Sequence, residues 1–260
     1  MSIKKTPAGP DLRDLREKID AVDEKLLALL AQRSRLVNQV AQAKRDSGQT
    51  HILRPAREAQ QMRKFLDWHS HNAGDMPLSG FQAVWREIIS SSVSQQKPLT
   101  VFCAGTVFDA AKAQFGQAAQ YMQAGDASAL FANVVNTPHA IGVADLQVDG
   151  FLPQLYTIVQ ERLTPAVRIF LCLPLFQASA QIFCFGQIPA EPSGEDRTLL
   201  IGPVAALPSN AEELAAENGI GLAMMDGFVT QEALHPSAQE GGVFVCGSYP
   251  LFEERLKGQV

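Results

Sequence analysis

The sequence lacks the features of several protein classes. No apolar run reaches the roughly 20 residues that a membrane-spanning helix needs. The opening MSIKKTPAGP contains no hydrophobic segment, so we expect a loose tail over residues 1–10 and no signal peptide. The net charge of −5 predicts no strong attraction to nucleic acid or to anionic membranes. We therefore expect a cytoplasmic protein that binds neither a nucleic acid nor a membrane.

Cysteine is scarce, and its spacing argues against two kinds of site. The chain has four cysteines and no Cys-x-x-Cys pair. Such wide spacing does not suit a zinc site or a disulfide framework. We expect buried free thiols, as in a reducing compartment, at Cys103, Cys172, Cys184 and Cys246.

Proline is nearly absent from residues 11–97, where apolar residues recur at helical spacing. The pattern predicts a first helix from about residue 11 to residue 46, ended by Ser47 and Gly48. A second helix is predicted from Pro55 to about residue 71, and a third over about residues 80–96, capped by Ser79. The apolar stripe of the first helix consists of Ile19, Val22, Leu26, Leu29, Leu30, Leu36, Val37 and Val40.

The first helix is too long for a compact three-helix domain. About 35 helical residues span roughly 50 Å, so much of the stripe extends beyond any cover from two shorter helices. A second chain would supply the missing surface. We therefore predict a homodimer with intertwined helices.

The pattern changes at Pro98, where short β-rich runs begin to alternate with helical segments. This alternation predicts an α/β domain over residues 98–260, after an all-α domain over residues 11–97. The predicted helices are FDAAKAQFG, DASALFANVV and SNAEELAAENG. The predicted strands are LTVFCAG, HAIGVADL, VRIFLCLPLF, QIFCFGQI, RTLLIGPVA, GIGLAMM and GGVFVCGSYP.

Polar residues interrupt or border the apolar faces of the three predicted helices. Arg33 and Lys44 are eleven residues apart, which places them about 20° apart around a helix. Arg16 is turned by about 100° from Arg33 and could serve a different pocket. Any one of these cations could simply be a solvated surface charge. The other members of the set are Arg54, Arg57, Glu58, Ser92 and Gln96.

Three segments together resemble the all-helical chorismate mutases: LREKIDAVDEKLLALLAQRSRLVNQVAQAK, then RPARE, then REIISSSVSQQ. The likeness covers residues 11–97. These proteins occur alone or as the N-terminal part of bifunctional prephenate dehydratases. The resemblance implies the rearrangement of chorismate to prephenate in aromatic amino acid biosynthesis. This unimolecular reaction relies on positioning and electrostatics, so we expect no cofactor and no metal.

The resemblance also implies roles for the polar residues at matching positions. Arg33 and Arg57 would bind the substrate carboxylates from the same chain, and Ser92 would line that side of the site. A further carboxylate ligand would be Arg16 of the partner subunit. The planar guanidinium suits these contacts because it can bind a carboxylate through two parallel hydrogen bonds.

The remaining roles concern the ether oxygen and the hydroxyl group of chorismate. By resemblance, Lys44 and Gln96 would donate hydrogen bonds to the ether oxygen, and Glu58 would receive the hydroxyl. One position departs from the family, which often has Asp where this chain has Arg54. That arginine could assist anion capture, distort the loop, or be an exposed loop residue.

Residues 98–260 resemble the periplasmic-binding-protein-like prephenate dehydratase domain, but without its catalytic motifs. TVFCAGTVFDAAKAQFG has the place of the opening strand and turn of that domain. At the Pro-Ile-Glu-Asn-Ser segment the chain reads VADLQVDG, and alignment on Arg197 puts Asp196 in place of an essential Thr. We therefore predict a degenerate, non-catalytic domain with a regulatory or structural role.

Two alternatives stay open. The protein could be a working bifunctional mutase and dehydratase, against which Asp196 and the missing Glu-Asn-Ser group argue. It could also be a non-catalytic binding or regulatory protein, for which Arg54 is the main support. An intact arrangement of the polar residues would count against this second alternative.

Overall fold

The computed structural model describes residues 11–48, 53–72, 74–161, 166–175 and 182–252. The predicted tail over residues 1–10 lies outside these ranges. The chain divides into two compact units, Met1–Thr50 and His51–Val260, which are described separately.

The described part of the first unit is one long helix, α1 (Leu12–Asp46). It begins where Asp11 accepts a hydrogen bond from the backbone N–H of Arg13 at 3.2 Å. It ends at Ser47, and Gly48 follows with a φ of +70°. The structure thus confirms the predicted helix and its end.

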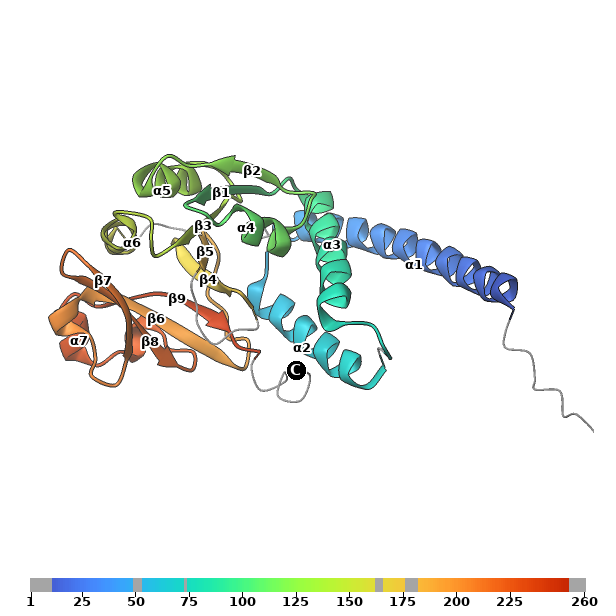
Figure 1. Cartoon of the computed structure of the whole chain (residues 1–260). Coiled ribbons are helices and arrows are strands. Elements are labelled where there is room, and N and C mark those ends of the chain that lie inside the picture. Colours follow the sequence, from blue (N-terminus) through green and yellow to red (C-terminus); the bar gives the residue numbers. More distant parts are fainter. Residues whose placement is uncertain (1–10, 49–52, 73, 162–165, 176–181, 253–260) are drawn as a thin grey trace, which may run out of the picture. The chain divides into compact units, whose positions relative to one another are not determined.

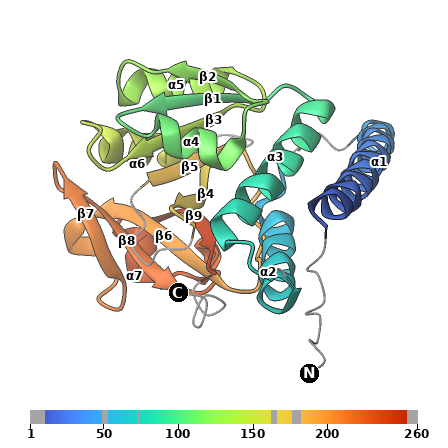
Figure 2. The same ribbon diagram turned by 45° about the vertical axis from the view of Figure 1, so that its right-hand side comes forward.

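The second unit begins with α2 (Pro55–Asn72) and α3 (Leu78–Gln96), which lie side by side in Figure 2. Their contact is apolar and aromatic, with Phe65 stacked on Phe81 at 4.6 Å between ring centroids. Both helices were predicted, but the expected cap at Ser79 is wrong. Pro77 takes the N-cap position, and its carbonyl accepts from the N–H of Phe81 at 3.1 Å. With φ −61° and ψ 140°, Pro77 has the extended backbone that is usual for an N-cap residue.

Among the described residues, the rest of this unit is built on a mixed sheet of nine strands, in the order β2-β1-β3-β5-β4-β9-β6-β8-β7 (Figure 1). Strand β1 pairs in parallel with β2 and β3, and the other pairs are antiparallel except β4 with β9. The strands are β1 (Thr100–Ala104), β2 (Gln120–Gln123), β3 (Ile141–Asp145), β4 (Arg168–Leu173), β5 (Ile182–Gly186), β6 (Asp196–Pro203), β7 (Glu212–Glu217), β8 (Ile220–Asp226) and β9 (Phe244–Pro250).

Helices cover both faces of the sheet. Alternation along β1 sends Phe102 and Val101 into two different apolar clusters. The first cluster includes α5 (Ala127–Asn136) and α6 (Phe151–Gln160), and the second includes α3 and α4 (Phe108–Phe115). The short α7 (Pro236–Glu240) packs in a smaller cluster near β6 and β9. Helix α3, which the sequence analysis assigned to the all-α domain, therefore packs against one face of the sheet.

One predicted helix is wrong. The segment SNAEELAAENG contains strand β7, which pairs with β8 along an antiparallel ladder. Asn218 and Gly219 join the two strands with φ values of +52° and +80°. An Asn-Gly pair with positive φ at both residues makes a tight hairpin turn. Hydrogen bonding to the edge of β8 thus overrides the helical propensity of Glu, Leu and Ala.

The four cysteines are buried and free, as predicted. Burial raises the pKa of Cys103 to about 11 and that of Cys246 to about 12, so both thiols stay protonated near neutral pH. None of the described helices combines the length and apolar character needed to cross a membrane.

Candidate functional site

The predicted polar residues of the first unit lie along α1. Arg16 is exposed, whereas Arg33 and Lys44 are partly buried. Partial burial lowers the pKa of Arg33 from its ordinary value, but a guanidinium remains charged at any physiological pH. The three predicted cations therefore lie at different positions along the helix, each held by regular α-helical geometry.

The predicted residues of α2 lie in its first turn, directly after Pro55. Arg57 is exposed and Glu58 is partly buried. Arg54, just before the helix, forms an exposed ion pair with Glu191, with 3.2 Å between Nη2 and Oε2. The arginine that departs from the family pattern is thus bound to the loop that follows β5.

The predicted residues of α3 lie in its last turns and form hydrogen bonds within the helix. The Ser92 hydroxyl donates to the carbonyl of Ile88 at 2.7 Å. The Gln96 side-chain amide donates to the carbonyl of Ser92 at 3.1 Å. Ser92 is buried and Gln96 is partly buried, and they share one face at the i, i+4 spacing.

Sequence reasoning missed Arg86, which the structure brings to Glu58. The Arg86 guanidinium is buried, and its Nη1 lies 3.9 Å from Oε2 of Glu58. The available signal was its spacing on α3, because Arg86, Ser90 and Val93 follow one another at i, i+4 and i+7 along the buried face. A cation on an apolar face needs a partner of opposite charge.

A pocket of about 20 Å³ opens beside this ion pair. That volume has room for about one water molecule and none for an organic substrate. Residues from α2, α3, α4, β4 and the β9 end surround it: Leu53, Pro55, Glu58, Ala59, Arg86, Gln114, Phe115, Phe170, Leu171, Pro250 and Phe252.

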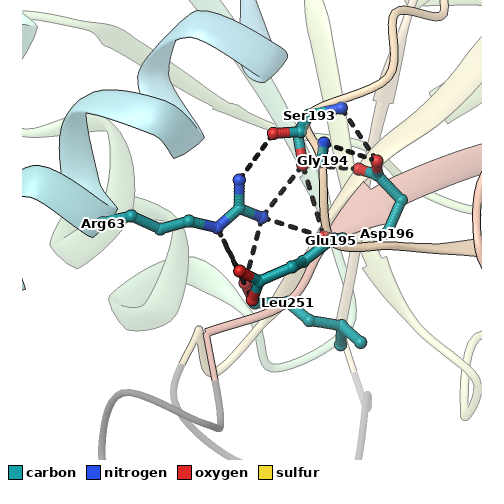
Figure 3. Close-up of polar contacts among 6 residues, drawn as sticks. All are labelled: Arg63, Ser193, Gly194, Glu195, Asp196 and Leu251. Atoms are coloured by element: carbon teal, nitrogen blue, oxygen red, sulfur yellow. Dashed lines mark hydrogen bonds and ion pairs between the residues drawn. The ribbon is translucent and has the colours of Figure 1, made fainter.

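A second buried arginine joins α2 to the sheet (Figure 3). The Arg63 guanidinium donates to the carbonyls of Ser193 at 2.7 Å, Glu195 at 2.8 Å and Leu251 at 3.1 Å. It also donates to the hydroxyl of Ser193 at 3.0 Å. These bonds fix α2 against the chain entering β6 and leaving β9.

Asp196 and Arg197, the residues aligned with the dehydratase motif, both contact other residues of the second unit. Asp196 accepts from the Ser193 hydroxyl at 2.6 Å and from the backbone N–H of Gly194 at 3.1 Å (Figure 3). Arg197 pairs with the exposed Asp226, with 3.3 Å between Nε and Oδ1. Asp196 thus shapes the loop that enters β6, and the Arg197–Asp226 pair joins the neighbouring strands β6 and β8.

The predicted mutase residues fall into both compact units. Arg16, Arg33 and Lys44 belong to Met1–Thr50, and the others belong to His51–Val260. Within the second unit, the first turn of α2 and the last turns of α3 present the remaining predicted side chains. Their convergence on one substrate with the residues of α1 stays a prediction, as does a domain boundary between residues 97 and 98.

Comparison with known proteins identifies the N-terminal region. Residues 15–97 match the family described as chorismate mutase type II. A bifunctional chorismate mutase/prephenate dehydratase from Pseudomonas aeruginosa is 32% identical over 133 residues, which cover 50% of this chain and 33% of the relative. A bifunctional chorismate mutase/prephenate dehydratase from Aquifex aeolicus is 28% identical over 142 residues, covering 53% of this chain and 39% of the relative.

The chain thus covers well under half of the length of these relatives. Both alignments are longer than residues 15–97, so part of the similarity lies outside the mutase match. A solved structure described as "GqqA- a novel type of quorum quenching acylases" has a TM-score of 0.39 at 16% identity, covering 61% of this chain and 98% of that one. Residues 15–97 thus resemble chorismate mutase type II, and the sheet described above follows them in the chain.

Proposed function

We propose that this protein is a chorismate mutase, which rearranges chorismate to prephenate in aromatic amino acid biosynthesis. The match of residues 15–97 to the chorismate mutase type II family carries the proposal. Further support comes from the polar set on three helices, whose types suit a dianionic substrate and an ether oxygen.

In the proposed reaction the protein holds two carboxylates and stabilises charge that develops on the ether oxygen. Arg33 and Arg57 bind the carboxylates, and Ser92 joins them by turning its hydroxyl away from the Ile88 carbonyl. The bond breaks and forms within the substrate, so rate acceleration comes from orientation and from donors placed in advance.

Two donors and one acceptor complete the proposed site. Lys44 and Gln96 donate to the ether oxygen, and Glu58 accepts from the substrate hydroxyl. The Gln96 amide has two donor hydrogens, so its bond to the Ser92 carbonyl is compatible with a second bond to the substrate.

We further propose a homodimer in which each site includes Arg16 of the partner subunit. The support is the exposed apolar stripe of α1, where Leu26 is 52% and Leu30 is 43% exposed. A long helix with such a stripe gains stability by packing against a second chain. We also propose a cytoplasmic location, which suits four free buried thiols.

The α/β region is proposed to have no dehydratase activity of its own. Asp196 is engaged in hydrogen bonds to the loop before β6, and Arg197 is engaged in an ion pair with Asp226 of β8. A bifunctional enzyme is the second candidate, favoured by the names of the aligned relatives. Supplying prephenate to the purified chain at neutral pH separates the two, because phenylpyruvate would form only if the second candidate is right.

The decisive experiment is the loss of chorismate absorbance with the purified chain. We expect turnover by the wild type and a reduction of at least about a hundredfold in Lys44→Ala and Gln96→Ala, since each removes a donor to the transition state. Lys25→Ala and Gln95→Ala are matched controls on the same helices and should keep turnover within about twofold. A wild type without turnover would make the proposal wrong.

The shared site has its own test. Chains with Arg16→Ala and chains with Lys44→Ala should each be inactive alone. When they are unfolded together and refolded as a mixture, about a quarter of wild-type turnover should return, because half the dimers then hold one intact site. If Arg16 served its own chain, mixing would restore nothing.

A further inference from the structure

Arg86 on α3 is a buried cation that the roles described so far do not use. Its exposed fraction is 6%, and its Nε has no hydrogen-bond partner among the described residues. Burial lowers the pKa of Arg86, and the attraction of Glu58 and Cys184 acts in the opposite direction. Burying a guanidinium costs much free energy unless a counter-charge compensates it.

Glu58 supplies that counter-charge from α2. Its Oε2 lies 3.9 Å from Nη1 of Arg86, which is an ion-pair distance and too long for a direct hydrogen bond. The adjacent pocket of about 20 Å³ has room for one water to bridge the two groups. The pair therefore fixes the direction of the Glu58 carboxylate while leaving its oxygens able to accept further hydrogen bonds.

The α/β region encloses this pair with uncharged residues. Gln114 comes from α4, Phe170 and Leu171 come from β4, and Phe252 follows β9. Such a wall lowers the local dielectric constant and strengthens the attraction between Arg86 and Glu58. The α/β region thus acts on a side chain in the first turn of the mutase helix α2.

We infer that Arg86 is a positioning residue for Glu58, and that the α/β region takes part in mutase catalysis by burying Arg86. The inference rests on the proposed function, in which the Glu58 carboxylate accepts the substrate hydroxyl. Arg86 contacts no substrate. Its charge orients the Glu58 carboxylate, so that the acceptor is in place before chorismate binds.

The test measures kcat/KM for chorismate against pH in the wild type, Arg86→Met and Arg86→Lys. Among the described residues that line the pocket, Glu58 and Arg86 are the titratable ones; Arg54 and Arg57 lie on the same segment, and Cys184 faces Arg86. Removing the cation disfavours the charged form of the Glu58 carboxylate, so the acidic limb should move to higher pH in Arg86→Met. At neutral pH kcat/KM should fall about tenfold, and Arg86→Lys should restore most of both effects.

Arg63→Met is the matched control. It also removes a buried arginine from the helical pair, but Arg63 lies five residues from Glu58, about 140° around α2, and contacts Ser193, Glu195 and Leu251. This variant should lose stability without moving the acidic limb. If the acidic limb moved equally in Arg63→Met and Arg86→Met, the role of Arg86 would be merely structural and the inference would be overturned.

A double variant tests whether Arg86 acts through Glu58. In a Glu58→Gln background, Arg86→Met should change kcat/KM by no more than about twofold, because the group that it positions is already gone. A full tenfold loss in that background would contradict the inference. If the wild type turns over chorismate and Arg86→Met keeps its pH profile, the inference fails and the proposed function stands; a wild type without turnover refutes both.

Discussion

Helix α1 and strand β6 are both rich in leucine, but their leucines differ in burial. Leu26 and Leu30 of α1 are 52% and 43% exposed, whereas Leu199 and Leu200 of β6 are fully buried. The strand lies between two other strands and beneath packed helices, so one chain supplies every surface that it needs. The helix has an equally regular apolar stripe, but its leucines at positions 26 and 30 stay exposed. Leucine therefore stabilises the fold of the single chain in β6, whereas in α1 it favours association with another chain.

The largest effect is expected from substitutions in the apolar stripe of α1, which is the proposed dimer interface. Leu26→Asp combined with Leu30→Asp places two charges in the apolar stripe. We expect the chain to become monomeric by sedimentation analysis and mutase turnover to fall at least about a hundredfold, because the proposed site needs an arginine from the partner. Lys25→Asp changes the net charge by the same amount at an exposed position of the same helix and should keep the dimer. A double variant that still sedimented as a dimer would contradict the comparison.

The next effect tests the fully buried side of the comparison. Leu199→Ala should lower the free energy of unfolding by about 3 kcal/mol, because it leaves a cavity between packed layers. Urea titration measures it. Leu27→Ala is the matched control, since Leu27 is 67% exposed and lies outside the predicted stripe; it should cost less than about 0.5 kcal/mol. Similar losses of unfolding free energy in the two variants would mean that β6 and α1 do not differ in how far their leucines are buried within one chain.

A third effect concerns why α2 belongs with the sheet. Arg63→Met removes the hydrogen bonds to Ser193, Glu195 and Leu251, and it leaves their buried or partly buried carbonyls without this donor. We expect a loss of about 2–3 kcal/mol in unfolding free energy. Amide exchange along α2 should accelerate as well, because the helix loses its anchor on the β9 end. Lys64→Met, at the exposed neighbouring position, should leave both quantities nearly unchanged.

The parts that the sequence predicts well depend on local patterns. The span of α1 follows from apolar periodicity and from Ser47 and Gly48 after it, and the strand runs follow from β-branched and aromatic residues between breakers. The segment of strand β7 is predicted as a helix because its residues favour that structure, whereas the positive φ values of Asn218 and Gly219 mark a hairpin turn.

What the sequence could not give are contacts between distant segments. The seating of α3 against α4 and the partners of Arg63 join residues that are far apart in the chain, and no local pattern encodes them. Arg86 shows the same limit. Its place on a buried helical face was readable from spacing, but its ion pair with Glu58 depends on how two helices meet.

The smallest effect concerns Arg54, the arginine that departs from the family pattern. Its ion pair with Glu191 leaves the two side chains 47% and 38% exposed, so water and salt screen the attraction. We expect Arg54→Ala to change the free energy of unfolding by less than about 1 kcal/mol, and the change should shrink further in high salt. Glu191→Ala should give the same small value if the pair is the whole effect. If Arg54 also assists anion capture, KM for chorismate should rise in Arg54→Ala and not in Glu191→Ala, with kcat unchanged. Equal KM values in the two variants would assign Arg54 to the surface alone, in contrast to the buried arginines of the same helical pair.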